Sequence, residues 1–81
     1  MKASAGLQAG FARALREKRK AAAVSQEELA HRANLHPTYI SQLERGLKSP
    51  SLAAIESLAL ALELRPDELI KAAQDKAPRS P

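Results

Sequence analysis

The amino-acid sequence predicts an all-α fold, a compact domain of five helices. Apolar residues make up 44% of the chain and are mostly alanine and leucine, whereas the β-branched residues that favour strands are scarce. Apolar positions recur at helical spacing in five segments, and turn residues separate those segments. With 81 residues, the chain has the size of one domain. We expect the folded domain to span residues 7–73, between a flexible N-terminus at 1–6 and a flexible C-terminal tail at 74–81.

The first two helices have clear boundaries in the sequence. We expect one helix from about Leu7 to Ala22, with its apolar residues on one stripe. Ser25 then opens a second helix, which continues through Ala33. Ser25 and Glu28 have the spacing of a capping box, in which each side chain accepts a hydrogen bond from a backbone N–H of the first turn.

The third helix follows a tight turn at residues 34–36. Asn34 tolerates the left-handed backbone conformation that a sharp turn needs. Pro37 suits the first position of a helix, and Gly46 is typical of the residue that ends one. The inward-facing apolar residues of this helix are Ile40 and Leu43. The second and third helices are therefore both short and are joined by three residues.

The last two helices begin at Ser51, a favourable N-cap, and at Pro66, which is followed by two acidic residues that suit a helix N-terminus. The apolar stripe that we expect to bury the fourth helix consists of Leu52, Ile55, Leu58, Ala59 and Leu62. The fifth helix has Leu69 and Ile70 as apolar anchors. These two residues either join the core or meet a second protomer.

The charge and the missing residue types limit the possible functions. The net charge is +4, and residues 1–20 contain six basic side chains against Glu17 alone. This basic segment either faces a polyanion or is simply solvated. The chain has no cysteine, which excludes disulfides and thiolate metal sites and fits a cytoplasmic protein. No apolar run approaches the roughly 18 residues of a membrane span, so we expect no membrane partner.

Two short helices joined by a three-residue turn, the second of them polar on one side, describe a helix-turn-helix. Its second helix fits the major groove of DNA, where its N-terminal residues reach the edges of the bases. Residues 25–30 (SQEELA), 38–46 (TYISQLERG) and 49–52 (SPSL) resemble the phage-repressor family of the Cro and CI type, also called the xenobiotic-response-element family. The resemblance covers roughly Phe11 to Ile70. It implies a lambda-repressor-like DNA-binding domain.

The resemblance also suggests a subfamily and a set of site residues. Asn34-Leu35 with residues 38–41 and 44–45 resembles the controller proteins of restriction–modification systems, which are of about this length and dimerise through their last helices. The positions that match the base-reading surface are Pro37, Thr38, Gln42 and, assisting them, Ser41. The positions that match phosphate contacts are Gln26, Tyr39, Arg45 and Lys48. Arg19 and Glu44 match a family pair that forms a partly buried structural ion pair.

Some of these positions have a second interpretation. Gln42 is the strongest candidate for base readout because its amide can pair with adenine at two points. Pro37 has no side-chain donor and offers only apolar contact. Tyr39 is either a phosphate contact or a half-buried core residue. His36 either contacts phosphate or caps the third helix. Ala23 and Glu63 stand where the family often has glycine, so those turns are strained or the helices are longer.

The sequence offers no sign of catalysis or of a cofactor. The two histidines, His31 and His36, have no partners that would complete a metal site, and no nucleophile–base pair, glycine-rich phosphate loop or small-molecule substrate site is evident. We therefore expect no enzyme activity. The predicted function is a sequence-specific transcriptional regulator that binds double-stranded DNA as a homodimer on a two-fold operator, through a recognition helix at residues 37–45. The alternative is an antitoxin-like or other protein-interaction module on the same scaffold.

Overall fold

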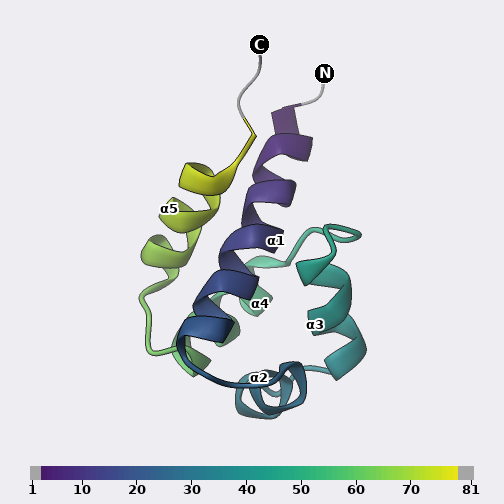
Figure 1. Cartoon of the computed structure of the whole chain (residues 1–81), viewed down its shortest axis with the longest axis vertical. Helices are drawn as coiled ribbons and strands as arrows, with labels where there is room; N and C mark the ends of the chain where they lie inside the picture. The colour runs from purple at the N-terminus through teal and green to yellow at the C-terminus, as the bar shows by residue number, and fades with distance from the viewer. Residues whose placement is uncertain (1–2, 79–81) are drawn as a thin grey trace.

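The computed structural model describes residues 3–78, which form five helices and no strand (Figure 1). The helices are α1 (Ala3–Ala21), α2 (Gln26–Ala33), α3 (Pro37–Glu44), α4 (Leu52–Ala61) and α5 (Pro66–Lys76). The all-α fold class is confirmed. The long α1 and α5 lie side by side in antiparallel directions, and α3 packs on α1. The short α2 packs on α3 and α4, and α4 also packs on α5.

All five helices contribute to one core. Six large side chains are fully buried, at least one from each helix. They are Leu15, Leu29, Ile40, Leu43, Leu58 and Leu69. Each such side chain contributes about 1.5–3 kcal/mol to the free energy of folding when it leaves water. This shared core fixes the angle between α2 and α3, on which a helix-turn-helix depends.

The two ends of the domain are more helical than expected. The first helix begins at Ala3, four residues before the expected start, and ends at Ala21. Its first turns are rich in alanine, which has a high helix propensity. The last helix continues to Lys76, past the expected boundary at residue 73. Flexibility of segments 1–6 and 74–81 stays a prediction, and residues 1–2 and 79–81 lie outside the described range.

Three helices end at a residue with a left-handed backbone that is not glycine. The φ angles are 59° at Ala23, 57° at Asn34 and 59° at Glu63. The backbone N–H of the next residue then bonds to the carbonyl five residues back, as Leu35 does to Ala30 at 2.9 Å, which satisfies a carbonyl of the last helical turn. The turns at Ala23 and Glu63 are therefore strained, and the alternative of longer helices is wrong.

The apolar stripe of α4 is only partly buried. Ile55, Leu58 and Ala59 lie in the core, as expected, but the side chain of Leu52 is 82% exposed. Leu52 lies in the first turn of α4, which no other helix covers, so its assignment to the core is wrong. Ile70 on α5 is also 38% exposed. An apolar surface therefore remains open between α4 and α5.

Candidate nucleic-acid interface

The helix-turn-helix consists of α2, the turn at residues 34–36 and α3. Its inner side is closed by buried residues, and its outer side is polar. The structure places all four predicted base-reading residues on α3: Pro37 and Thr38 are exposed at its start, and Ser41 and Gln42 are half-buried further along. The four residues therefore lie on one helix, and the major groove is wide enough to admit an α-helix.

The start of α3 is held by His36. The Nδ1 atom of His36 accepts a hydrogen bond from the backbone N–H of Thr38 at 3.1 Å. This bond satisfies one of the N–H groups that a helix leaves unpaired at its N-terminus. The structure confirms that His36 caps α3. The contact of His36 with phosphate stays a prediction. The cap also fixes the backbone of Thr38.

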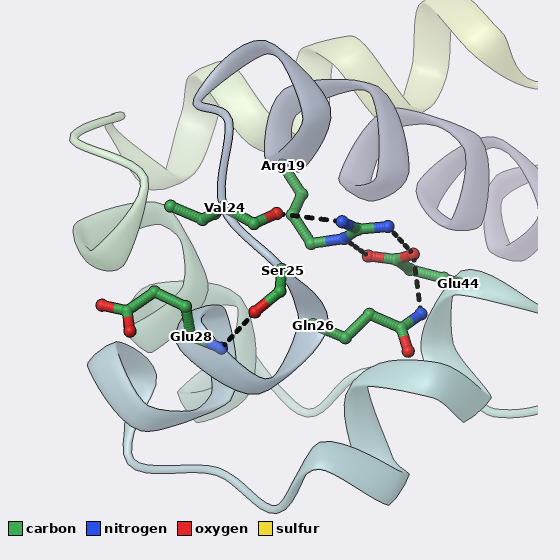
Figure 2. Close-up of polar contacts among 6 residues, drawn as sticks. All are labelled: Arg19, Val24, Ser25, Gln26, Glu28 and Glu44. Carbon is green, nitrogen blue, oxygen red and sulfur yellow. Dashed lines mark hydrogen bonds and ion pairs between the residues drawn. The ribbon is translucent and has the colours of Figure 1, made fainter.

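A buried network ties α1 to both helices of the motif (Figure 2). Arg19 donates to Glu44 twice, from Nε to Oε2 at 2.6 Å and from Nη2 to Oε1 at 3.0 Å, and Gln26 Nε2 donates to Oε1 at 3.1 Å. A third Arg19 nitrogen donates to the carbonyl of Val24 at 2.9 Å. The side chains of Arg19 and Glu44 are only 12% and 3% exposed. This is the ion pair that the family resemblance implies, and its hydrogen bond raises the pKa of the Arg19 guanidinium.

The network gives Gln26 a defined orientation. Its side chain lies at the first position of α2 and one of its amide hydrogens goes to Glu44, so its second amide hydrogen stays available to a ligand. A phosphate contact from Gln26 would therefore come from a side chain already held in place. Sequence reasoning placed Gln26 near phosphate, but it did not predict the bond to Glu44.

The N-terminus of α2 has only half of the predicted capping box. Ser25 Oγ accepts from the backbone N–H of Glu28 at 3.0 Å, as expected (Figure 2). The reciprocal bond is wrong, because the carboxylate of Glu28 instead accepts from Arg32 Nε at 2.8 Å, one turn further along. That hydrogen bond lowers the pKa of Glu28. The arginine competes successfully since a charged donor makes a stronger hydrogen bond than a backbone N–H.

The remaining predicted phosphate contacts come from α3 and from the loop that follows it. Tyr39 is half-buried against the core, and its hydroxyl accepts a long hydrogen bond of 3.4 Å from the backbone N–H of Ser51. The core interpretation of Tyr39 therefore describes where its ring lies, and its contact with phosphate stays a prediction. Arg45 and Lys48 are exposed and form no ion pair with any residue in the described range.

Gln8 supports the loop that follows α3, and the sequence did not predict this role. Gln8 on α1 donates from Nε2 to the carbonyl of Gly46 at 2.9 Å, and its Oε1 accepts from the hydroxyl of Ser49. The side chain spans the loop that follows α3. No local signal could have revealed it, because the partners lie 38 and 41 residues away in the sequence.

The described residues contain neither a metal site nor a membrane span. Between residues 3 and 78, no three histidine or acidic side chains come together as a metal site. None of the described helices combines the length and the apolar character that crossing a bilayer requires.

The fold and the geometry of α2 and α3 define a helix-turn-helix protein. Residues 15–69 match the Helix-turn-helix family, so the chain belongs to that family of DNA-binding transcription regulators. Within it the chain is homologous to restriction–modification controller proteins of the Cro and CI type. It is 47% identical over 47 residues to the control protein C.BamHI of Bacillus amyloliquefaciens, a match that covers 58% of each chain.

Two solved structures and a second sequence relative are also similar to this chain. The controller protein C.AhdI from Aeromonas hydrophila is 42% identical, with a TM-score of 0.75 over 76% of this chain and 94% of that one. The clp gene regulator ClgR from C. glutamicum is 30% identical, with a TM-score of 0.82 over 89% and 92% of the two chains. An uncharacterised regulator of Mycobacterium tuberculosis is 38% identical over 55 residues, 68% of this chain. The chain spans 58% of C.BamHI and 39% of the mycobacterial relative.

Proposed function

We propose that this protein is a sequence-specific regulator that inserts α3 into the major groove of double-stranded DNA. The observation that supports this most directly is the preorganised outer side of α3. Its start is capped by His36, its end is fixed through Glu44, and polar side chains lie between these two supports. A rigid reading surface avoids the entropy cost of ordering side chains on binding.

The roles of the individual residues follow from their chemistry. Gln42 pairs with a base through its amide, Thr38 offers a hydroxyl or a methyl group, and Pro37 adds apolar contact. Ser41 assists these three residues. The residues proposed to contact phosphates are Gln26, His36, Tyr39, Arg45 and Lys48. Phosphate contacts position the protein, and the α3 residues select the sequence.

We further propose that the protein acts as a homodimer. The apolar surface between α4 and α5 is lined by Leu52, Ile55 and Ile70, and an unpaired apolar surface of this kind marks an interaction site. A domain of this size also gains stability from association. A two-fold pair would place its recognition helices on half-sites one helical turn, roughly 34 Å, apart.

The homology to C.BamHI and C.AhdI supports a biological role as the controller of a restriction–modification system. The alternative of a protein-interaction module remains an outcome of the tests below, because none of the comparisons favours it. Under that alternative the helix-turn-helix would be retained as a scaffold without sequence preference.

The proposal is tested by selecting bound duplexes from a random pool. We expect an enriched palindrome with half-sites one helical turn apart; a pool without enrichment would contradict sequence-specific binding. The Gln42→Ala protein should then lose about 1–3 kcal/mol on the selected operator and little on random duplex. Lys48→Gln should weaken both by the same factor, since a phosphate contact is blind to sequence.

The dimer is tested separately. Sedimentation of the wild-type protein should give a two-chain species at micromolar concentration, and Leu52→Glu should convert it to a monomer with unchanged helix content. If Leu52→Glu remains dimeric, the interface lies elsewhere on the molecule.

A further inference from the structure

The basic residues divide sharply between those that are paired and those that are not. Five ion pairs form within residues 3–78, and each uses a different basic side chain. The described basic residues outside those pairs are Arg13, Arg16, Lys18, Lys20, Arg45 and Lys48. All six lie on α1 or between the end of α3 and the start of α4. The basic side chains without an ion-pair partner are thus confined to α1 and to the segment that follows α3.

Half of these six residues lie on the open side of α1. Ala12 and Arg19 face α3, whereas Gly10 and Glu17 face α5. Phe11 and Leu15 point into the core. Helical periodicity leaves one strip of α1 uncovered, and its charged members, all exposed, are Arg13, Arg16 and Lys20. This basic strip is bordered by α3 on one side and by α5 on the other.

A hollow of about 500 Å³ joins the basic strip to the end of α3. Arg13 lines it from α1, and Arg45 lines it from the C-cap position of α3. Its other walls are Gln8, Ala9, Ala12, Glu44 and Gly46. Only Glu44 could repel an anion there, and its carboxylate is already paired with Arg19. Arg13 uses one nitrogen to donate to the carbonyl of Lys76 at 3.2 Å, which leaves further N–H groups for a ligand.

We propose that this hollow and the basic strip bind phosphates of the DNA backbone that flank the base pairs read by α3. The hollow has one arginine on each side, and small alanine and glycine residues form part of its walls. This charge and shape match a phosphodiester. The strip holds no large exposed apolar residue, so it lacks the apolar side that a membrane-surface helix needs. The inference rests on the proposed function, because it extends the DNA contact surface from α3 to α1.

The test compares Arg13→Gln and Arg16→Gln with Arg65→Gln. Arg65 is a matched control: it carries the same charge, its side chain is 78% exposed and it lies at the start of α5. The affinity of each protein for its selected operator and for a random duplex is measured across a range of salt concentrations. Each lost phosphate contact should flatten the plot of log affinity against log salt by about 0.9, which weakens binding about fivefold at 0.15 M salt.

We expect Arg13→Gln and Arg16→Gln to flatten the slope on operator and random duplex alike, and Arg65→Gln to match the wild type. Shortening the operator duplex to the recognised base pairs should abolish the difference between wild type and Arg16→Gln. Slopes equal to that of the wild type in both variants would overturn the inference while leaving the proposed function intact. A wild-type protein without duplex binding would overturn both. The side chain of Arg16 makes no hydrogen bond within the described residues, so its variant also separates DNA contact from a loss of folding.

Discussion

The side-chain amide of Gln8 bonds to the carbonyl of Gly46 and so joins α1 to the loop between α3 and α4 (Nε2 to O, 2.9 Å). Gly46 has a φ angle of 72° and terminates the recognition helix, so this bond fixes the point where the chain leaves α3. The loop contains Lys48 and follows Arg45, which we propose as phosphate contacts. Gln8 therefore positions these residues.

Replacing Gln8 by alanine should loosen this loop. We expect Gln8→Ala to lower the free energy of unfolding by about 0.5–1.5 kcal/mol, the usual contribution of a hydrogen bond, and to weaken duplex binding several-fold. Ser49→Ala removes only the second bond of Gln8 and should have a smaller effect on both quantities. The measurements are urea unfolding and duplex affinity. An effect of Ser49→Ala as large as that of Gln8→Ala would show that the Gly46 bond is not the important one.

The Arg19–Glu44 pair should be the most sensitive polar contact of the domain. Glu44→Gln leaves the nearly buried guanidinium of Arg19 without its counter-ion, and we expect a loss of about 3–5 kcal/mol in the free energy of unfolding. Glu28→Gln breaks an ion pair whose members are 44% and 47% exposed, and it should cost far less. The double variant Arg19→Met with Glu44→Leu should recover much of the loss, since no charge is then stranded. A double variant as unstable as Glu44→Gln would contradict this.

Features set by neighbouring residues were predictable from the sequence, and features set by competition or by tertiary packing were not. The caps at Ser25 and Ser51 and the turn at Asn34 depend on residues within one helical turn, and all three are found. The carboxylate of Glu28 had two local partners, and periodicity could not decide between Ser25 and Arg32. The stripe of α4 identified apolar positions but not which of them a neighbouring helix would cover.

The residues of the candidate interface also include some that the sequence predicts and some that only the folded chain defines. The positions on α3 and the Arg19–Glu44 pair followed from family resemblance, because they belong to a motif of fixed spacing. Gln8 belongs to no such motif, and its partner is 38 residues away. The hollow between Arg13 and Arg45 depends on the angle between α1 and α3, which only the folded chain defines.

The strained turns at Ala23 and Glu63 should improve with glycine. A left-handed alanine or glutamate costs roughly 1–2 kcal/mol, and the greater freedom of glycine in the unfolded chain offsets part of that gain. We expect Ala23→Gly and Glu63→Gly each to raise the free energy of unfolding by about 0.5–1 kcal/mol. Ala21→Gly, inside the last turn of α1, is the matched control and should lower it. Equal effects of the two alanine replacements would contradict the strain.

Stability should fall in acid partly through Glu17. The hydrogen bond from Lys76 Nζ to Glu17, 2.9 Å long, lowers the pKa of Glu17 below its ordinary value of 4.5. The unfolded chain therefore binds the proton first as pH falls, so the stabilisation is present above 4.5 and is lost as pH drops through the folded-state pKa. Glu17→Gln should be less stable than the wild type at pH 7, and the gap should close in acid. Thermal unfolding from pH 3 to pH 7 measures this, with Glu56→Gln as the exposed control; a gap that does not change with pH would refute it.

Gly10 sets how closely α1 and α5 approach. A Cβ atom at this position would meet the carbonyl of Ala73 and lie 2.8 Å from the backbone nitrogen of Ala77, so Gly10→Ala must push α5 away. Such overpacking costs about 1–3 kcal/mol. It should also weaken the proposed dimer, because α5 contributes Ile70 to the surface shared with α4.

Gly6 lies one turn earlier, and its nearest contact would be the carbonyl of Pro78 at 3.7 Å, so Gly6→Ala should be neutral or stabilising through helix propensity. Urea unfolding and sedimentation of the two variants test both statements: a Gly10→Ala protein as stable and as dimeric as Gly6→Ala would mean that the close crossing of α1 and α5 does not control the position of α5.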